Sequence, residues 1–309
     1  MVKDGNAEEI KFNADCYIPV CLTLGAQSKM FLFMINNKQD KAVVFLYNLG
    51  YSRIRNYLLK LYRRPVTRFL VFHDVATSHR ENFESNMSFL KLNTNVVSLE
   101  EFFAGILSTV KINTVITFDD GYKGWIVNAL PVLKKLSLPA TFFISSGFVG
   151  LDKIKEEVFI KKNLFTKLPP REITGGLSND DLKKLASDGF TIGGHTLNHC
   201  VLDSALDVMK IKHEIVADKN NLEILTGRKV NYFSYPTGAY YNTHINLTEI
   251  LIQANYKGAV TVVPGFNTSA TNPYMLCRDI VSASMPYKIF RARVLGNYDA
   301  LRLLKNMLS

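Results

Sequence analysis

An apolar run that ends in two adjacent carboxylates constrains this chain more than any other feature. Residues 115–118 read Val-Ile-Thr-Phe, and Asp119, Asp120 and Gly121 follow directly. A β-branched apolar run is typical of a buried strand, so the strand presents both acids where it leaves the sheet. Two neighbouring carboxylates repel each other unless a cation, a basic partner or a shared proton stabilises them. An Asp-Gly turn that only ends the strand is the alternative.

Short apolar strands alternate with helical segments through the middle of the chain. This pattern predicts a parallel α/β sheet or barrel. The predicted strands are 69–72, 96–99, 115–118, 140–144 and 190–192, and the predicted helices between them are 82–91, 99–109, 124–136 and 180–187. Ser178 and Asp181 have the spacing of a capping box that opens the last of these helices.

The chain divides on sequence into an N-terminal extension, residues 1–64, and a main domain, residues 65–309. Residues 41–64 alternate apolar and basic side chains and predict a basic amphipathic helix, interrupted at Gly50. Such a helix either packs on the main domain or lies on an anionic membrane surface. Residues 288–309 predict a closing helix or a pair of helices. Residues 150–176 are lysine-rich and predict either a lid or a plain surface insertion.

The net charge and the cysteine content limit the kinds of binding partner and the cellular compartment that we expect. The net charge is +10 over 309 residues, which favours an anionic partner. The sequence lacks the interleaving of basic and aromatic residues that is typical of nucleic-acid binding, so we do not expect nucleic acid to be that partner. Acidic residues precede the first apolar run, unlike a signal peptide, so we expect a cytoplasmic protein, either free or peripheral to the membrane. The sparse cysteines lack a CxxC pair and predict free thiols; they are Cys16, Cys21, Cys200 and Cys277.

A pair of histidines forms the second notable feature. His195 and His199 are four positions apart and follow the predicted strand at 190–192. One helical turn would place both imidazoles on one face, close enough to bind a single ion. Two histidines and one aspartate form an open site that Zn, Fe, Co or Ni can occupy. Each histidine alone would more often be structural. Cys200 follows directly and is expected to point away from such a site.

Four motifs together resemble the polysaccharide deacetylase family, the carbohydrate esterase family 4 type with the NodB homology domain. They are TFDDG at 117–121, ATFF at 140–143, HTLNH at 195–199 and YPTG at 235–238, and the likeness extends from Phe69 to Arg278. The resemblance implies a deformed (β/α) barrel that removes acetyl groups from N-acetylated sugars. It also implies one divalent metal ion, with Zn favoured and Co, Ni or Fe as alternatives.

Roles for individual residues follow from the resemblance. Asp119 resembles the general base, and Asp120, His195 and His199 resemble the metal ligands. The backbone N–H of Thr237 lies where the family places a donor to the tetrahedral oxyanion.

The sequence departs from the family at three places. The third motif of the family has an arginine and an aromatic residue, where this chain has Ser234 and Thr237. Arg278 is the candidate for an arginine that contacts Asp119 from another strand in place of the missing one. The alternative is that Arg278 is a surface residue. The family's tryptophan motif is absent, and the single tryptophan, Trp125, is expected in the core.

The fifth motif lacks the histidine that serves as general acid. Met285 occupies its neighbourhood and cannot donate a proton. His73, at the end of the strand 69–72, is the alternative acid, against a purely structural role beside Asp74.

Three functions remain open from sequence. The leading one is metal-dependent hydrolytic N-deacetylation of an amino sugar in an oligosaccharide, a polysaccharide or a glycan precursor. The others are an amidase for a non-sugar amide and a glycan-binding pseudoenzyme. The sequence does not indicate the oligomeric state.

Overall fold

A computed structural model describes residues 37–51, 54, 64–164, 173–203, 206–238 and 245–308. The chain forms two compact units, Met1–Ile35 and Asn36–Ser309. The first unit lies outside the described residues, as do Cys16, Cys21 and most of residues 52–63. Everything below concerns the second unit. The domain boundary at residue 64 stays a prediction.

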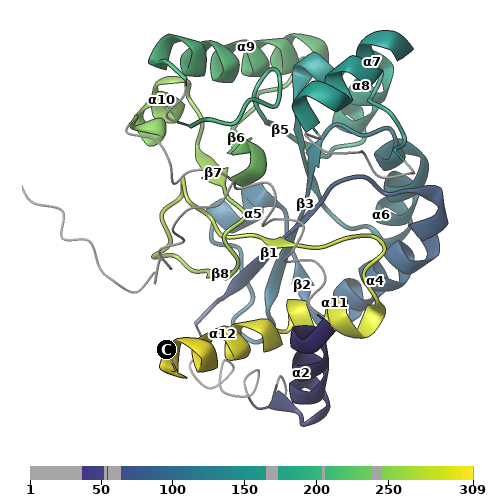
Figure 1. Cartoon of the computed structure of the whole chain (residues 1–309), viewed down its shortest axis with the longest axis vertical. Coiled ribbons are helices and arrows are strands. Elements are labelled where there is room, and N and C mark those ends of the chain that lie inside the picture. Colours follow the sequence, from purple (N-terminus) through teal and green to yellow (C-terminus); the bar gives the residue numbers. More distant parts are fainter. Residues whose placement is uncertain are drawn as a thin grey trace, which may run out of the picture. The chain divides into compact units, whose positions relative to one another are not determined.

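One sheet forms the centre of this unit (Figure 1). The order of its described strands is β7-β6-β5-β4-β3-β1-β8, with β2 also beside β3 and β9 beside β1. The pairings of β1, β3, β4, β5, β6 and β7 along this path are parallel, and only β8 runs antiparallel to β1. The carboxyl ends of the parallel strands therefore meet at one edge. The strands are β1 (Thr67–Phe72), β2 (Asn95–Val96), β3 (Asn113–Asp120), β4 (Thr141–Ile144), β5 (Thr191–Gly194), β6 (Tyr232–Ser234), β7 (Gly258–Val260), β8 (Phe266–Asn267) and β9 (Asp279–Ile280).

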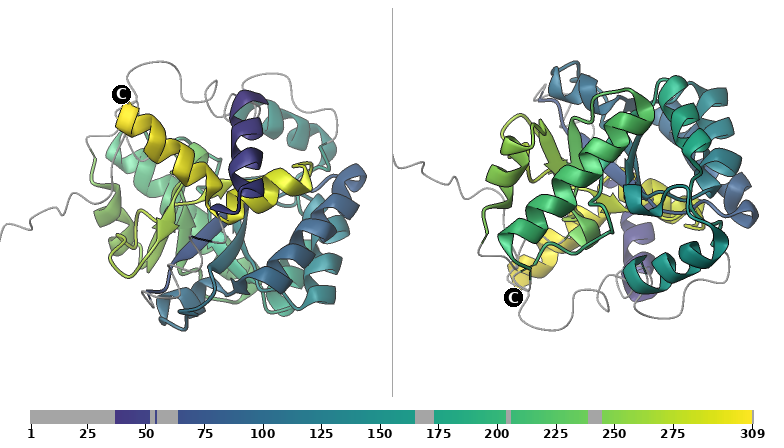
Figure 2. Two further views of the ribbon diagram at one scale, coloured as in Figure 1. Left: turned by 90° about the horizontal axis from the view of Figure 1, so that it is seen from below. Right: turned by 90° about the horizontal axis from the view of Figure 1, so that it is seen from above.

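Helices surround the curled sheet, as the two end views in Figure 2 show. This arrangement confirms the predicted deformed (β/α) barrel. The α-helices are α2 (Asn37–Asn48), α4 (Arg80–Asn93), α5 (Leu99–Phe103), α6 (Leu130–Leu136), α7 (Lys153–Phe159), α8 (Asn179–Ser187), α9 (Val208–Thr226), α10 (Leu247–Gln253), α11 (Tyr287–Val294) and α12 (Asn297–Leu308). Shorter turns are η1 (Thr77–His79), η3 (Ser146–Phe148) and η5 (Pro236–Gly238), and η2 (Trp125–Ala129) and η4 (Ile160–Leu164) are π-helical.

The core forms around β3, whose eight residues are all buried. Phe118 stacks on Phe72 and on Phe142, with ring centroids 5.4 and 4.8 Å apart. Trp125 is fully buried beside them, which confirms its predicted place in the core. Packed aromatic rings of this kind hold β3 in position relative to the neighbouring strands. They therefore also determine the position of the two acids at the end of β3.

Several predicted helices differ in length from the observed ones. The predicted helix 99–109 ends at Phe103, because Gly105 adopts a φ of 72° that a right-handed helix does not allow. The helix predicted from residue 41 begins earlier, at Asn37, and ends at Asn48 before Gly50, whose φ is 80°. The capping box of Ser178 and Asp181 is confirmed. The C-terminal segment forms the pair α11 and α12, and α2 packs against both.

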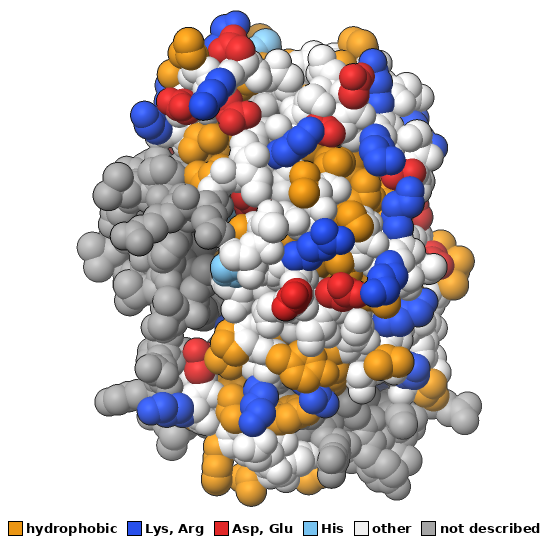
Figure 3. Space-filling view, turned by 90° about the vertical axis from the view of Figure 1, so that its right-hand side faces the viewer, with side chains coloured by type: hydrophobic (Ala, Val, Ile, Leu, Met, Phe, Trp, Pro, Cys, Tyr) orange, Lys and Arg blue, Asp and Glu red, His pale blue; other side chains and the backbone are white. Residues whose placement is uncertain are grey.

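Charged side chains of both signs cover the surface shown in Figure 3. Lysine and arginine lie there among acidic and apolar side chains and do not form one unbroken basic patch. Among the helices that the structure describes, none has the length and hydropathy to cross a bilayer.

Candidate functional site

The two acids at the end of β3 approach the same imidazole. Successive side chains of a regular strand point to opposite faces, which would separate Asp119 from Asp120. Asp120, however, has a φ of 92° and leaves the regular strand geometry. The Nε2 atom of His195 lies 4.0 Å from Oδ2 of Asp119 and 3.3 Å from Oδ1 of Asp120. The pair is therefore not a simple strand-ending turn.

The two histidines lie on a loop and not on the predicted helical turn. Residues 195–199 follow β5 without helical structure, and Thr196 and His199 have φ values of 62° and 53°. Such angles do not occur within a right-handed helix, so the prediction of a helical turn was wrong. The two imidazoles nevertheless meet, with ring centroids 5.0 Å apart.

Asp120, His195 and His199 fit a divalent metal ion. Oδ1 of Asp120 lies 3.3 Å from the Nε2 atom of each histidine. Each ring turns its Nδ1 toward a backbone carbonyl, that of Ser234 at 2.7 Å and that of Asn163 at 2.8 Å. A carbonyl partner requires a proton on Nδ1, so the neutral rings present the lone pair of Nε2.

An orphaned buried atom supports the same fit. Within the described part of the chain, Oδ1 of Asp120 is buried and has no hydrogen-bond donor. One potential ligand atom from each of the three residues lies within 4.8 Å of the others. A carboxylate oxygen and two imidazole nitrogens form a donor set that suits zinc and related ions. Cys200 does not belong to this cluster, as predicted.

The charges of the cluster depend on one another. Burial would raise the pKa of Asp120, but hydrogen bonds with His195 and His199, when these are protonated, hold it well below its usual range. Burial would lower the pKa of His195, but Asp119 and Asp120 raise it. Protons and a cation therefore compete for the same buried space.

Arg278 reaches Asp119 from the position just before β9. Its Nη1 and Nη2 atoms donate to Oδ1 and Oδ2 of Asp119, each at 2.7 Å. Nη2 also donates to Oγ of Ser234 at 2.7 Å, and that hydroxyl lies 3.0 Å from Oδ2 of Asp119. Burial would raise the pKa of Asp119, but the charges of Arg278 and His195 lower it. Arg278 is fully buried, so the alternative of a surface arginine is wrong.

His73 lies at the same end of the sheet as both acids, because Phe72 pairs with Phe118. It directly follows β1, and a positive charge on it lowers the pKa of Asp119 and of Asp120. The indole Nε1 of Trp125 donates to the carbonyl of His73 at 2.8 Å. Asp74 accepts hydrogen bonds from the backbone N–H and the hydroxyl of Thr174, at 2.9 and 2.8 Å. These contacts fix the backbone around His73.

Thr237 and Met285 complete the set of sequence-predicted positions. Thr237 lies three residues after Ser234, has a φ of 57°, and its hydroxyl has no partner among the described residues. Met285 is 7% exposed and packs in the core.

Several residues near the site have no signal in the sequence pattern used above. The carbonyl of Asn163 holds His199 from the segment 150–176, so the described part of that segment packs beside the cluster of Asp120, His195 and His199. Glu214 and Asp218, on α9, bind the loop 195–199. Glu214 and Asp218 are four residues apart, but this spacing alone does not indicate a contact with the loop.

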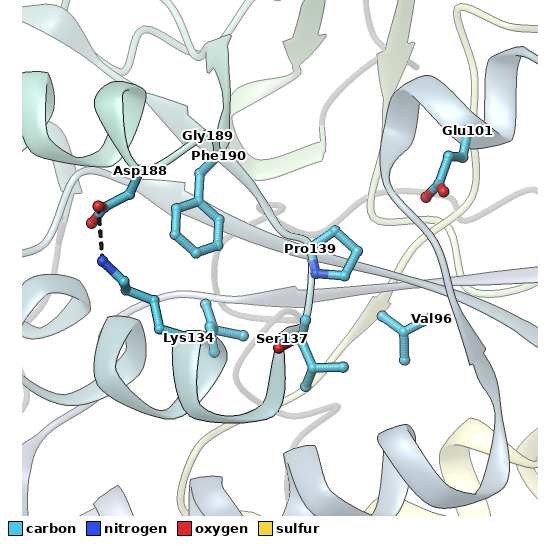
Figure 4. A pocket seen from close by; sticks show the side chains of 10 residues that line it. Val96, Glu101, Lys134, Ser137, Pro139, Asp188, Gly189 and Phe190 are labelled. Atoms are coloured by element: carbon cyan, nitrogen blue, oxygen red, sulfur yellow. Dashed lines mark hydrogen bonds and ion pairs between the residues drawn. The ribbon is translucent and has the colours of Figure 1, made fainter.

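A pocket lies at the opposite edge of the sheet (Figure 4). Pro139 and Phe190 line it just before β4 and β5 begin, and Lys134 and Asp188 form an ion pair at its side. It is separate from the carboxyl ends of the strands and contains none of the site residues.

Known proteins share this sequence pattern and this fold. The profile of the family described as polysaccharide deacetylase matches residues 108–257. The Bacillus subtilis (strain 168) protein YxkH, named as a polysaccharide deacetylase, is 24% identical over 234 residues, which cover 73% of this chain and 75% of YxkH.

Two solved structures illustrate the shared fold. The Streptococcus pyogenes deacetylase PplD, in complex with acetate, aligns with a TM-score of 0.59 and 19% identity, over 75% of this chain and 99% of PplD. IcaB from Ammonifex degensii aligns with a TM-score of 0.59 and 21% identity, over 75% of this chain and 97% of IcaB. At these identities the alignments establish a common fold.

Proposed function

The chain belongs to the polysaccharide deacetylase family, whose members hydrolyse amide bonds, and we propose that it removes the acetyl group from an N-acetylated amino sugar with one divalent metal ion. The substrate in this proposal is an oligosaccharide, a polysaccharide or a glycan precursor. The observation that carries the proposal is the separation of tasks between two adjacent acids. Asp119 is held by Arg278, whereas Asp120 faces His195 and His199.

The metal would be held by Asp120, His195 and His199. When bound, it would supply the Lewis acidity that activates water and polarises an amide carbonyl at neutral pH. The donor set favours Zn, with Co, Ni or Fe as alternatives. Both histidines are already oriented by carbonyls at 2.7 and 2.8 Å, so little reorganisation is needed.

Asp119 would act as the general base. Its lowered pKa keeps the carboxylate ionised at neutral pH, ready to accept a proton from the attacking water. Arg278 and Ser234 fix both of its oxygens, so the carboxylate has one orientation. Arg278 is thus a positioning residue in this proposal.

Thr237 and His73 would handle the oxyanion and the leaving amine. The strained backbone at Thr237 turns directly after β6, the strand whose Ser234 carbonyl holds His195. Its N–H would donate to the developing oxyanion. His73 would protonate the departing nitrogen in place of the histidine that the fifth motif lacks. Its position directly after Phe72, which pairs with Phe118 at the end of β3, supports this role.

Acetate release tests the proposal. The metal-loaded protein is incubated with an N-acetylglucosamine oligosaccharide and, separately, with a non-sugar acetamide and formamide. We expect acetate from the sugar, little acetate from the acetamide, little formate from the formamide, and loss of activity in Asp119→Asn and His195→Ala. Turnover of only the non-sugar amides would favour the amidase. Metal and glycan binding without acetate release would identify a pseudoenzyme, which the absence of a fifth-motif histidine motivates.

The proposed substrate source is a glycan precursor at an anionic membrane face, reached from the cytoplasm. The net charge of +10 supports this part of the proposal. Vesicles that contain an anionic lipid should retain the protein at low salt and release it at high salt. Equal binding to neutral vesicles would contradict the electrostatic basis.

A further inference from the structure

The loop that carries both histidines is held from one side by two buried acids of α9. Glu214 and Asp218 are one helical turn apart, and their exposed fractions are 1% and 0%. Neither is near enough in sequence to be a part of the histidine motif. Both accept hydrogen bonds from the backbone of the loop 195–199.

Asp218 joins the loop to the end of the neighbouring strand. Its Oδ2 accepts the backbone N–H of His195 at 2.8 Å, and its Oδ1 accepts the backbone N–H of Ser146 at 2.8 Å. Ser146 lies just beyond β4, which pairs with β5. One carboxylate therefore fixes the first ligand relative to the adjacent strand end.

Glu214 holds the middle of the loop. Its Oε2 accepts the backbone N–H of Asn198 at 2.9 Å, and its Oε1 accepts the side-chain amide of Asn198 at 2.9 Å. Its backbone carbonyl also accepts the N–H of Leu197 at 2.9 Å. Three hydrogen bonds thus connect one residue of α9 to the two residues that precede His199.

The segment after β4 closes on the other side of the loop. The hydroxyl of Ser145 donates to the carbonyl of His195 at 3.0 Å, and the N–H of Gly147 donates to the carbonyl of Leu197 at 2.8 Å. The loop needs such support, because Thr196 and His199 have positive φ values that side-chain-bearing residues rarely adopt.

We propose that Glu214 and Asp218 are positioning residues that hold His195 and His199 in the geometry of metal ligands. The inference rests on the proposed metal site. Without the two acids, the backbone N–H groups of the loop lose their acceptors, and the loop relaxes from its strained conformation. The imidazoles then no longer converge on Asp120, and metal affinity falls.

Metal affinity, rather than turnover, tests the inference. Glu214→Gln and Asp218→Asn keep the shape of each side chain but replace one acceptor with an N–H group that faces a donor. Zn²⁺ affinity is measured by competition with a chromophoric chelator, and the site geometry by the visible absorption of bound Co²⁺. We expect each variant to bind Zn²⁺ about 10- to 100-fold more weakly, with an altered Co²⁺ spectrum, as is usual when partners of metal ligands are lost.

Glu223→Gln is the matched control. Glu223 is also on α9 and accepts the N–H of Val230 at 3.0 Å, away from the histidine loop. The Zn²⁺ affinity of the Glu223→Gln variant should stay within about two-fold of wild type. The control therefore distinguishes a general destabilisation of α9 from the loss of hydrogen bonds to the histidine loop.

A milder variant covers the case in which a buried substitution prevents folding. Asn198→Ala removes only the amide that donates to Glu214, at a half-buried position, and should still weaken Zn²⁺ binding measurably. If wild type binds Zn²⁺ and all folded variants bind it equally well, the inference is wrong. If wild type itself fails to bind, the proposed metal site is wrong instead.

Discussion

Arg278 and Asp119, which are 159 positions apart in sequence, form a two-point ion pair across the sheet with both hydrogen bonds at 2.7 Å. The guanidinium also donates to the carbonyl of Thr261 and to the hydroxyl of Thr117, at 2.7 and 3.1 Å. The planar fork of arginine meets all of these acceptors at once, which a lysine cannot do. Arg278 contacts both oxygens of Asp119, and Ser234 contacts only one, so the orientation of Asp119 depends most on Arg278.

Arg278→Lys should lower kcat by about 10- to 100-fold, because Asp119 keeps a positive neighbour but loses its fixed orientation. Zn²⁺ affinity should change little, since Asp119 is not among the proposed ligands. Steady-state acetate release and a Zn²⁺ titration measure both effects. Arg302→Lys, at a 42% exposed side chain on α12, is the control. An unchanged kcat in Arg278→Lys would show that the pair is only structural.

His73→Gln should lower kcat for an amide substrate by about 100-fold, because the leaving amine then lacks a proton donor. Hydrolysis of 4-nitrophenyl acetate should be nearly unaffected, since its leaving group departs without protonation. The comparison of the two substrates separates an acid from a structural histidine. His79→Gln is the control, because the imidazole of His79 bonds only the hydroxyl of its neighbour Ser78 among the contacts described. Equal losses on both substrates would argue against a proton-donating role.

Removal of metal should destabilise the folded protein. A ligand present at 100 times its Kd stabilises the folded state by about 2.7 kcal/mol. Added Zn²⁺ should therefore raise the Tm of chelator-treated wild type by several degrees. The same addition to His199→Ala should leave its Tm unchanged. A Zn²⁺-induced rise of equal size in His199→Ala would place the bound ion elsewhere.

Asp181 links α8 to the segment after β3, and its effect on stability should depend on pH. Burial would raise the pKa of Asp181, but hydrogen bonds from Lys123 and Ser178 lower it. A carboxyl group whose pKa is lower in the folded state stabilises it fully above its unfolded pKa of about 4, and this contribution disappears as the pH falls through the folded pKa.

Asp181→Asn should therefore reduce the free energy of unfolding at pH 7 by about 0.5 to 1 kcal/mol, as expected for a weakened helix cap. The difference from wild type should shrink as the pH is lowered below about 4. Urea unfolding at several pH values measures it. Asp180→Asn is the control, since the side chain of Asp180 is 95% exposed. A difference that grows toward acid pH would have the wrong sign.

The sequence predicted the parts of the site that local patterns encode. Apolar runs located β1, β3 and β4, and parallel strands bring their carboxyl ends together, so Asp119, Asp120 and His73 could be placed at one edge. Arg278 could be proposed only because the arginine of the third motif was missing. Its contact with Asp119 depends on how β9 pairs with β1, which the sequence pattern does not specify.

The parts that could not be predicted depend on backbone conformation and distant contacts. The spacing of His195 and His199 suggested a helix, but positive φ values and support from Glu214 and Asp218 produce the same convergence on a loop. The carbonyl of Asn163 has no side-chain signature at all. The buried cluster of Arg68 with Asp279 and Asp299, which ties α12 to the sheet, likewise joins residues more than 200 positions apart.

The central claim is that two adjacent acids have different tasks, and acetate release by metal-saturated Asp119→Asn tests it most directly. With a parallel Zn²⁺ titration, this variant should bind the ion about as tightly as wild type while kcat falls by about 100-fold or more. Asp120→Asn should instead lose the ion. Acetate release near the wild-type rate by Asp119→Asn would contradict the account.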